Sequence, residues 1–215
     1  MFTRTFWTDG ACSQNGTWAG GYGVVELNQD LSQTMNEYID RYSINFYKSG
    51  TYEKTTNNRM ELTAMLEALK QIDKYIESDE QDIKYIIYTD SAYVQNSCCT
   101  WIYNWAKNGW QNSKKVAVEN VDLMKEIYKY LTKNFNNCQI SILKVKGHNN
   151  ELGNELADAL ATSNRKKWKE LILKFNIAYN DICYCPICDK DVETTIYGRI
   201  GHCPKCGHHL NSEDK

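Results

Sequence analysis

The chain has 215 residues, of which 42% are hydrophobic and 24% are charged, and its formal net charge is −2. This size fits one core-forming domain with a small appendage, and the charge excludes a general attraction to nucleic acid, so such a partner has to meet a local patch. No run approaches the ~18 apolar residues of a membrane span, and the first residues lack a signal-peptide pattern. We therefore expect a soluble, cytoplasmic protein without a membrane partner.

The nine cysteines are distributed in a way that argues against a secreted disulfide scaffold. Four of them form two CPxC pairs near the C-terminus, and Cys12, Cys98, Cys99 and Cys138 are scattered through the rest of the chain. Paired cysteines are typical of metal ligands, and scattered thiols are typical of a reducing compartment. The pattern predicts a cytosolic protein with one metal site.

Two apolar stretches end in the same dipeptide, Thr-Asp. Phe2–Thr8 is rich in aromatic and β-branched residues, which predicts a strand that ends at Asp9. Tyr85–Thr89 predicts a second such strand, followed by Asp90. One such Asp commonly starts a turn, but a carboxylate at the tip of a buried strand is costly unless a cation meets it. Two of them predict a pair of carboxylates at one edge of a sheet.

A glycine-bearing turn and two further strands separate Asp9 from the first helix. Gly20, Gly21 and Gly23 permit the close approach of a hairpin, and GGYGVVELN reads as the second strand. A phosphate-cradling loop is the weaker interpretation, because no helix follows to supply its N-terminus. A third strand is expected within residues 37–47.

Residues 55–69, TTNNRMELTAMLEAL, give the clearest helix pattern in the chain. Thr56 or Asn57 can cap this helix, and apolar residues at helical spacing form a broad face. Glu61 lies in the first turn beside that face. An acid there often serves only to stabilise the helix dipole, so Glu61 alone is ambiguous.

The chain after Asp90 alternates helices with one strand. The expected elements are a helix over 91–106, a helix over 119–135, a strand over 138–145, and a polar loop from 146 running into a helix that continues to about 175. Residues 107–118 contain three lysines and no acid, which is typical of a solvated loop or of a duplex-binding handle. With the earlier strands, this order predicts an α/β fold in which helices cover a mixed sheet.

Four acids stand at expected strand ends or in half-buried helix turns: Asp9, Glu61, Asp90 and Asp158. Each has a structural explanation by itself, but clustered carboxylates repel one another unless a cation neutralises them. Hard divalent ions such as Mg²⁺ take oxygen ligands, and pairs of them catalyse in-line displacement at phosphorus. The residues alone therefore predict a metal–carboxylate site for phosphoryl transfer.

The sequence blocks around these acids resemble type 1 ribonuclease H. The matching blocks are TDGAC with the glycine hairpin, TNNRMEL, YTDSAYV, and VKGH followed by GNELAD, and the similarity covers roughly Phe2–Lys167. WIYNWAKNGW resembles the tryptophan-rich handle of bacterial members. The resemblance implies a ribonuclease H-like five-stranded mixed sheet flanked by helices. It also implies an endonuclease that cleaves the RNA strand of RNA–DNA hybrids and leaves 5′-phosphate and 3′-hydroxyl ends.

The resemblance also implies roles for individual residues. Asp9, Glu61, Asp90 and Asp158 match the acids that hold two catalytic metal ions, Mg²⁺ or alternatively Mn²⁺. His148 matches a flexible-loop histidine that assists turnover.

The substrate-contact positions of the family match this sequence less completely than its metal-binding acids do. The matching positions are Asn15, Asn57 and Asn58 for the minor groove, Thr56 and Asn120 for a DNA phosphate, and Trp101 for a DNA sugar. Ala92 departs from the family pattern, since a groove-reading glutamine is common there. The handle is also less basic than in its fullest form, which should weaken hybrid binding and its salt dependence.

The C-terminal tail carries the two CPxC pairs, Cys185 with Cys188 and Cys203 with Cys206, separated by fourteen residues. Two such pairs predict one structural Zn²⁺ in a zinc ribbon that needs the metal to fold. We expect a catalytic domain over 1–175, a linker over 176–182 and the ribbon over 183–215. The role of the ribbon stays open between duplex binding, protein docking and stabilisation, and the chain is expected to be a monomer.

Two alternatives to a hybrid-specific nuclease remain. One is a non-catalytic hybrid-binding module, against which the intact acids and His148 argue. The other is a ribonuclease H-fold nuclease that acts on another nucleic-acid structure, as transposases and junction resolvases do. Those families lack the TNNRMEL and TDSAYV blocks.

Overall fold

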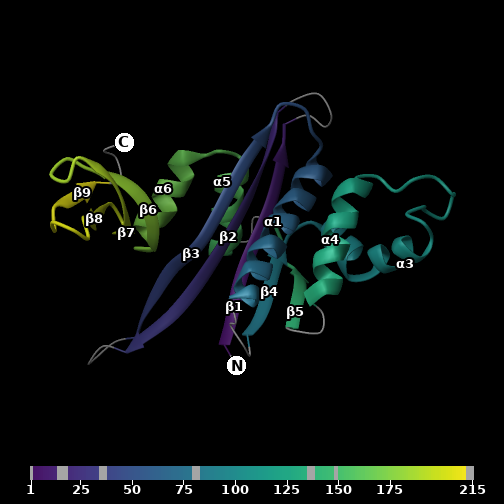
Figure 1. Cartoon of the computed structure of the whole chain (residues 1–215), viewed down its shortest axis with the longest axis horizontal. Helices are drawn as coiled ribbons and strands as arrows, with labels where there is room; N and C mark the ends of the chain where they lie inside the picture. The colour runs from purple at the N-terminus through teal and green to yellow at the C-terminus, as the bar shows by residue number, and fades with distance from the viewer. Residues whose placement is uncertain are drawn as a thin grey trace. The chain divides into compact units, whose positions relative to one another are not determined.

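The structure, a computed structural model, describes residues 2–13, 19–33, 38–78, 83–134, 139–147 and 150–211. The chain divides into two compact units (Figure 1). Unit 1 consists of Met1–Glu26 and Tyr47–Asn164, and unit 2 consists of Leu27–Phe46 and Arg165–Lys215. None of the helices in the described ranges is long and apolar enough to cross a membrane.

A mixed sheet organises the first part of the chain. Its strands are β1 (Phe2–Cys12), β2 (Gly20–Gln33), β3 (Tyr38–Tyr52), β4 (Ile83–Thr89) and β5 (Gln139–Lys144), in the order β5-β4-β1-β2-β3. β1 is antiparallel to β2 and parallel to β4, and β4 is parallel to β5. The predicted α/β fold with a mixed sheet is confirmed.

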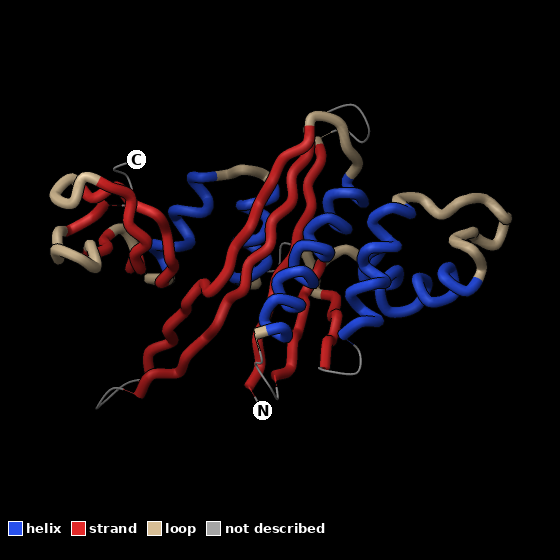
Figure 2. The backbone as a smooth tube through the Cα atoms, in the orientation of Figure 1, coloured by secondary structure: helices blue, strands red, loops and turns tan. Residues whose placement is uncertain are grey.

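Helices cover this sheet (Figure 2). They are α1 (Asn57–Glu77), α2 (Ala92–Asn96), the π-helical turn η1 (Ser97–Trp101), α3 (Ile102–Lys107), α4 (Val121–Asn134) and α5 (Leu152–Ala161). Both α1 and α5 pack on β1, and α4 packs on α1. The apolar spacing of α1 explains its place, since its inward residues are fully buried, among them Met60, Leu62, Met65, Leu69 and Ile72.

The pleat of β1 separates the two helices that cover it. A Cβ atom built on Gly10 would lie 2.2 Å from the backbone nitrogen of Glu61 in α1, and one built on Gly153 of α5 would lie 2.2 Å from the indole nitrogen of Trp7. Residues of even and odd number on a strand face opposite sides. Gly10 therefore faces α1, whereas Trp7 and Asp9 face α5.

β1 continues beyond the predicted end at Asp9. Thr8 is the last residue of β1 paired with β4, whereas pairing with β2 continues from Asp9 opposite Gly23 to Cys12 opposite Gly20. The glycine hairpin keeps β1 extended after its parallel neighbour has ended. Asp9 thus lies within a strand, at the point where the parallel part of the sheet stops.

The expected single helix up to about 175 is wrong, because the chain turns after Ala161 and a separate helix, α6 (Arg165–Lys174), follows, although it ends close to the expected position. Ser163 at the end of α5 has φ 54°, and Asn176 after α6 has φ 45°. In each turn two backbone N–H groups donate to carbonyls of the preceding helix, Asn164 to Ala159 and Ile177 to Ile172 among them. These bonds satisfy orphan carbonyls in the way of a Schellman motif.

Unit 2 is built on a β-ribbon. It contains α6 and the strands β6 (Ala178–Cys185), β7 (Lys190–Tyr197), β8 (Ile200–His202) and β9 (His209–Asn211). β6 and β7 are antiparallel, and β6 also pairs in parallel with β3 through Ser43 and Ile44. Residues 178–182 of the expected linker are therefore strand, because they all pair with β7 and the first two also pair with β3. The division into catalytic domain and ribbon stays a prediction.

Candidate active site

Three carboxylates from separate elements meet at one edge of the sheet. Asp9 of β1, Glu61 of α1 and Asp90, which follows β4, each place an oxygen within 4.8 Å of the others. Asp9 and Glu61 are buried, with exposed fractions of 8% and 4%. Such a group can hold a hard divalent cation, which prefers carboxylate oxygens.

The local backbone explains why these acids converge. β1 and β4 are parallel and in register up to Thr8 and Thr89, so the residues that follow, Asp9 and Asp90, leave the paired region together. Gly10 has no side chain, which allows the second turn of α1 to approach β1 and brings Glu61 beside Asp9. The expectation that Glu61 lies in the first turn was wrong, since α1 begins at Asn57.

The electrostatics of Glu61 favour a bound cation. Burial, followed by the nearby charges of Asp9 and Asp90, raises the pKa of Glu61 to about 9. Its Oε1 accepts a hydrogen bond of 3.5 Å from Asn57, whereas its buried Oε2 has no hydrogen-bond partner. A buried oxygen without a partner and a carboxylate destabilised by its neighbours are both relieved by a cation, so these residues fit a divalent metal ion.

Asp158 does not belong to the group of three carboxylates. Asp158 lies in α5. The carbonyl group of the residue before it, Ala157, lies against Gly23 of β2, and Gly23 is the strand partner of Asp9. Helix α5 thus brings Asp158 to the face of the sheet that Asp9 also faces. His148 and Asn15 lie outside the described residues. The backbone of Gly147 lies against the side chain of Asp90, since a Cβ atom built on Gly147 would be 2.7 Å from the Oδ2 atom of Asp90.

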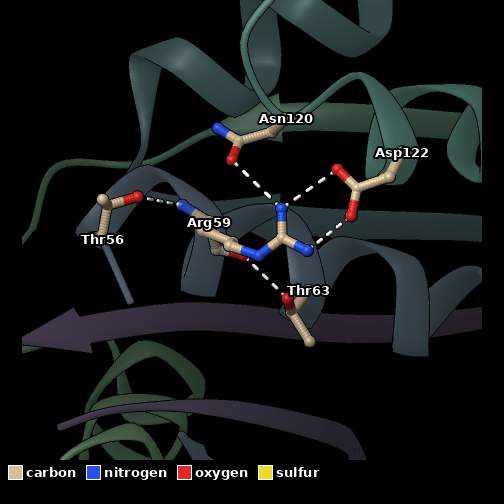
Figure 3. Close-up of polar contacts among 5 residues, drawn as sticks. All are labelled: Thr56, Arg59, Thr63, Asn120 and Asp122. Atoms are coloured by element: carbon tan, nitrogen blue, oxygen red, sulfur yellow. Dashed lines mark hydrogen bonds and ion pairs between the residues drawn. The ribbon is translucent and has the colours of Figure 1, made fainter. Parts of the chain in front are cut away.

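Arg59 connects α1 to the start of α4 (Figure 3). Its Nη1 donates to Asp122 Oδ1 at 3.0 Å and to Asn120 Oδ1 at 3.4 Å, and its Nη2 donates to Asp122 Oδ2. Its backbone N–H donates to Thr56 Oγ1, the N-cap of α1. Arg59 therefore contacts both residues expected at a DNA phosphate. Arg59 lies within the TNNRMEL block, but the sequence alone assigns it no role because its side-chain partners lie about 60 residues later in the chain.

The remaining expected contact residues lie around the same helices. Asn120 has φ 52° and shares a side-chain hydrogen bond with Tyr93, whose ring lies edge-on to Trp101 at 6.3 Å. Trp101 is 38% exposed, at the end of η1, and Asn58 is exposed in the first turn of α1. These side chains are accessible to a ligand from solvent.

Comparison with known proteins identifies the family. A family model described as RNase H matches residues 3–166. The chain belongs to the ribonuclease H family. The ribonuclease H of Rickettsia canadensis (strain McKiel) is 38% identical over 77% of this chain and 91% of its own length, and that of Orientia tsutsugamushi (strain Boryong) is 39% identical over 74% and 80%. Family membership at this level makes the protein a ribonuclease H enzyme.

A solved ribonuclease H shares the fold. The structure of LC9-RNase H1, a type 1 RNase H with the type 2 active-site motif, aligns with a TM-score of 0.55 and 25% identity over 77% of this chain and 73% of that one. In the present chain, the region that the RNase H family model matches includes all four acids and ends within the first turn of α6.

The four cysteines of the tail form a second cluster, beyond the matched ribonuclease H region. The sulfur atoms of Cys185, Cys188, Cys203 and Cys206 lie within 4.8 Å of one another. Two sulfur–sulfur distances are 3.6 Å and 3.8 Å, and a tetrahedral zinc site with Zn–S bonds of ~2.3 Å places sulfurs ~3.8 Å apart. Backbone N–H groups of Cys206 and Lys205 also lower the pKa of the Cys203 thiol to about 6. The donor set fits Zn²⁺.

Proposed function

We propose that this ribonuclease H hydrolyses the RNA strand of RNA–DNA hybrids by a two-metal-ion mechanism and leaves 5′-phosphate and 3′-hydroxyl ends. The observation that carries the proposal is the grouping of Asp9, Glu61 and Asp90 within 4.8 Å at one sheet edge, with the pKa of Glu61 raised to about 9. Mg²⁺, or alternatively Mn²⁺, is the proposed ion. When bound, two such ions activate the attacking water and stabilise the leaving oxygen.

The chain itself binds and positions the substrate in this proposal. Asp9, Glu61, Asp90 and Asp158 hold the metal ions. Thr56 and Asn120 bind a phosphate of the DNA strand, and their common partner Arg59 fixes the distance between α1 and α4. The exposed ring of Trp101 packs on a DNA sugar.

Polar side chains complete the proposed substrate site. Asn15, Asn57 and Asn58 contact the minor groove, where the 2′-hydroxyl distinguishes RNA from DNA. His148 assists proton transfer or product departure, for which an ordinary histidine pKa of ~6.5 is suited.

The remaining assignments concern the whole chain. We propose a cytoplasmic monomer with a catalytic domain over 1–175 and a C-terminal ribbon over 183–215. One structural Zn²⁺ is held by Cys185, Cys188, Cys203 and Cys206, whose sulfur spacing supports this assignment.

A cleavage assay on matched duplexes tests the function. The full chain is incubated with RNA–DNA, RNA–RNA and DNA–DNA duplexes of one sequence, in Mg²⁺, in Mn²⁺ and in chelator. We expect metal-dependent cleavage of the RNA strand of the hybrid alone, with 5′-phosphate ends on the products. Cleavage of all three duplexes, or of none by a protein that still binds hybrid, would refute the proposal.

A further inference from the structure

The four strands of the ribbon expose one face of their sheet to solvent. β6, β7, β8 and β9 are antiparallel neighbours (Figure 1), and residues that lie opposite one another in such a sheet point to the same side. The register places the even-numbered residues of 178–184 and the odd-numbered residues of 191–197 on one face, together with residues 200, 202 and 209. We call this the outer face. The alternate residues point to the other side and include the buried Cys183, Val192, Ile196 and Leu210.

The outer face carries two pairs of large apolar side chains. The first pair is Ile182 with Tyr184, which are successive outward residues of β6, and the second is Tyr197 with Ile200, which are opposite one another on β7 and β8. Their exposed fractions lie between 45% and 62%. Single exposed apolar residues are ordinary, but several gathered on one face mark an interaction surface.

A hollow of about 460 Å³ lies between the two apolar pairs. Its lining runs along β7 from Glu193, the strand partner of Ile182, to Tyr197, and includes Asn180. Thr195 donates a hydrogen bond of 2.8 Å to Asn180 Oδ1 across the strands, which holds these two side chains together. The Glu193 side chain has no hydrogen bond or ion pair with any residue that the structure describes. Its carboxylate is therefore available to a ligand.

The charge of the outer face is negative. Asp191 and Glu193 are its acids, and it contains no Lys or Arg. Lys190 pairs with Cys185 and so points to the other side of the sheet. Residues 178–211 together carry four Asp or Glu against three Lys or Arg. Such a face repels the phosphates of a nucleic acid and attracts a cationic group.

The dimensions of the outer face suit a peptide segment. β6 and β7 have eight residues each, which at ~3.3 Å per residue gives a length of about 26 Å, and four strands ~4.8 Å apart give a width of about 15 Å. The resulting area of roughly 400 Å² is about half of the ~800 Å² that each partner buries in a standard interface. A folded domain or a second copy of this chain needs a larger contact than this face offers.

We propose that the outer face is a docking site for a short segment of a partner protein in which an arginine lies between two apolar side chains. The guanidinium enters the hollow, pairs with the Glu193 carboxylate and stacks on the ring of Tyr197. It also donates to the amide oxygen of Asn180. A planar guanidinium can make these contacts at once, which favours arginine over lysine. The flanking apolar side chains pack on the two apolar pairs, and the ribbon thereby connects the nuclease to a partner.

Single-stranded nucleic acid is the competing ligand, because bases stack on exposed tyrosines. Proteins that bind it combine aromatic side chains with a positively charged groove along the backbone. The outer face offers Tyr184 and Tyr197 for stacking, but Asp191 and Glu193 stand where cations are needed. A basic peptide fits this combination better than a polyanion.

The test begins with a peptide selection on the full zinc-loaded chain. A phage-displayed library of random peptides is selected in parallel against the wild type and against E193R, and peptides enriched by the wild type alone are kept. We expect them to share an arginine with large apolar residues two positions away on either side, since alternate residues of an extended segment share a face. The consensus peptide is then synthesised with a fluorophore, and its Kd is measured by anisotropy.

We expect E193Q to weaken binding of the consensus peptide roughly fivefold to tenfold, because it removes the ion pair. Tyr197→Leu should weaken it several-fold, because the ring that stacks on the guanidinium is lost. E126Q, which neutralises an exposed acid on α4, is the matched control and should bind as the wild type does. A peptide with Glu in place of its Arg should bind E193R more tightly than it binds the wild type. Zinc content and melting temperature confirm that each variant is folded.

Three outcomes would overturn the proposal. The first is a selection in which the wild type does not enrich arginine or lysine relative to E193R. The second is a consensus peptide with equal affinity for the wild type, E193Q and Tyr197→Leu. The third is binding of labelled single-stranded DNA or RNA in chelator that Tyr184→Ser and Tyr197→Leu both lose, which would assign the face to nucleic acid. Hybrid cleavage is scored separately, because the docking site does not depend on it.

Discussion

The guanidinium of Arg59 faces the carboxylate of Asp122 with two parallel hydrogen bonds, and this pair joins α1 to α4. Neither residue is an acid of the candidate active site, yet the same arginine also bonds to Asn120 and to the cap residue Thr56. The pair lowers the pKa of Asp122 and raises that of Arg59. It thus holds the proposed phosphate contacts in place from outside the carboxylate group.

The variant Asp122→Asn tests whether the Arg59–Asp122 pair positions the substrate contacts or only stabilises the fold. Both side chains are partly exposed, so the loss of stability should be no more than ~1 kcal/mol. Because the pair orients Arg59 toward Asn120, KM for the hybrid should rise several-fold while kcat changes little. Steady-state kinetics and thermal melting check this. Glu126→Gln, an exposed change on α4, is the matched control, and an unchanged KM for Asp122→Asn would remove the positioning role.

Asp9→Asn and Asp90→Asn should each abolish cleavage, because an amide cannot replace a carboxylate in holding divalent ions. Metal ions are worth several kcal/mol of transition-state stabilisation, so the rate should fall by about 10³-fold or more in saturating Mg²⁺. Hybrid binding, measured by fluorescence anisotropy in chelator, should persist. A variant that retains more than a few per cent of the rate would contradict the two-metal assignment.

His148→Ala should reduce kcat by roughly tenfold to a hundredfold and leave KM nearly unchanged, since general acid–base assistance is typically worth ~10²–10⁴ and product release less. The effect should be far smaller than that of Asp9→Asn on the same hybrid. A rate profile against pH tests the role further, because the variant should lose the limb that reflects histidine ionisation. Equal rates for wild type and variant would show that His148 is a solvated loop residue with no role in turnover.

Cys203→Ser should release the zinc ion, since three thiolates and a hydroxyl hold Zn²⁺ far more weakly than four thiolates. Metal analysis of purified protein should give one equivalent for wild type and much less for the variant. Cys99→Ser is the control, because Cys99 is exposed and lies outside the cysteine cluster. Amide hydrogen exchange should then accelerate in β6 and β7 of the variant but not in β4.

The sequence predicts the sheet well because its signals are local and repeated. Apolar strands that end in Thr-Asp, glycines that permit a hairpin and one amphipathic helix suffice to predict a mixed sheet covered by helices. The break after Ala161 escapes prediction, since Ser163 adopts a positive φ where glycine is the usual signal, whereas α6 ends at Lys174, close to the expected helix end at about 175. Strand β6 escapes as well, because its partner in β3 lies more than 130 residues earlier in the chain.

The candidate site is predictable to a similar degree. Three of the four acids come together in the structure, as expected for carboxylates at one sheet edge, while their roles stay a prediction. Arg59 could not be assigned from sequence, because its partners Asn120 and Asp122 lie on another element. Gly10 comes just after the expected strand end at Asp9, and no local signal indicates that it lets α1 approach β1. Such contacts between elements leave no periodic signal.

The raised pKa of Glu61 predicts how the stability of the metal-free protein depends on pH. Between its ordinary pKa of 4.5 and the folded value of about 9, the unfolded chain has released the Glu61 proton and the folded protein retains it. Unfolding then releases a proton, so this contribution to stability is complete below pH 4.5 and is lost as the pH rises toward 9. In chelator, the melting temperature of the wild type should fall over this range.

Glu61→Gln should remove that dependence, because a glutamine stays neutral at every pH. In chelator at pH 8 the variant should melt at a higher temperature than the wild type, and at pH 5 the two should be close. Mg²⁺ should raise the melting temperature of the wild type at pH 8 more than that of the variant, since the ion binds the ionised carboxylate. Calorimetry measures the melting temperatures at pH 5 and pH 8 in chelator and at pH 8 in Mg²⁺. Glu126→Gln is the control for a simple loss of charge. Parallel pH curves for wild type and Glu61→Gln would show that burial and its acidic neighbours do not hold Glu61 protonated, and the electrostatic case for a cation at this site would fail.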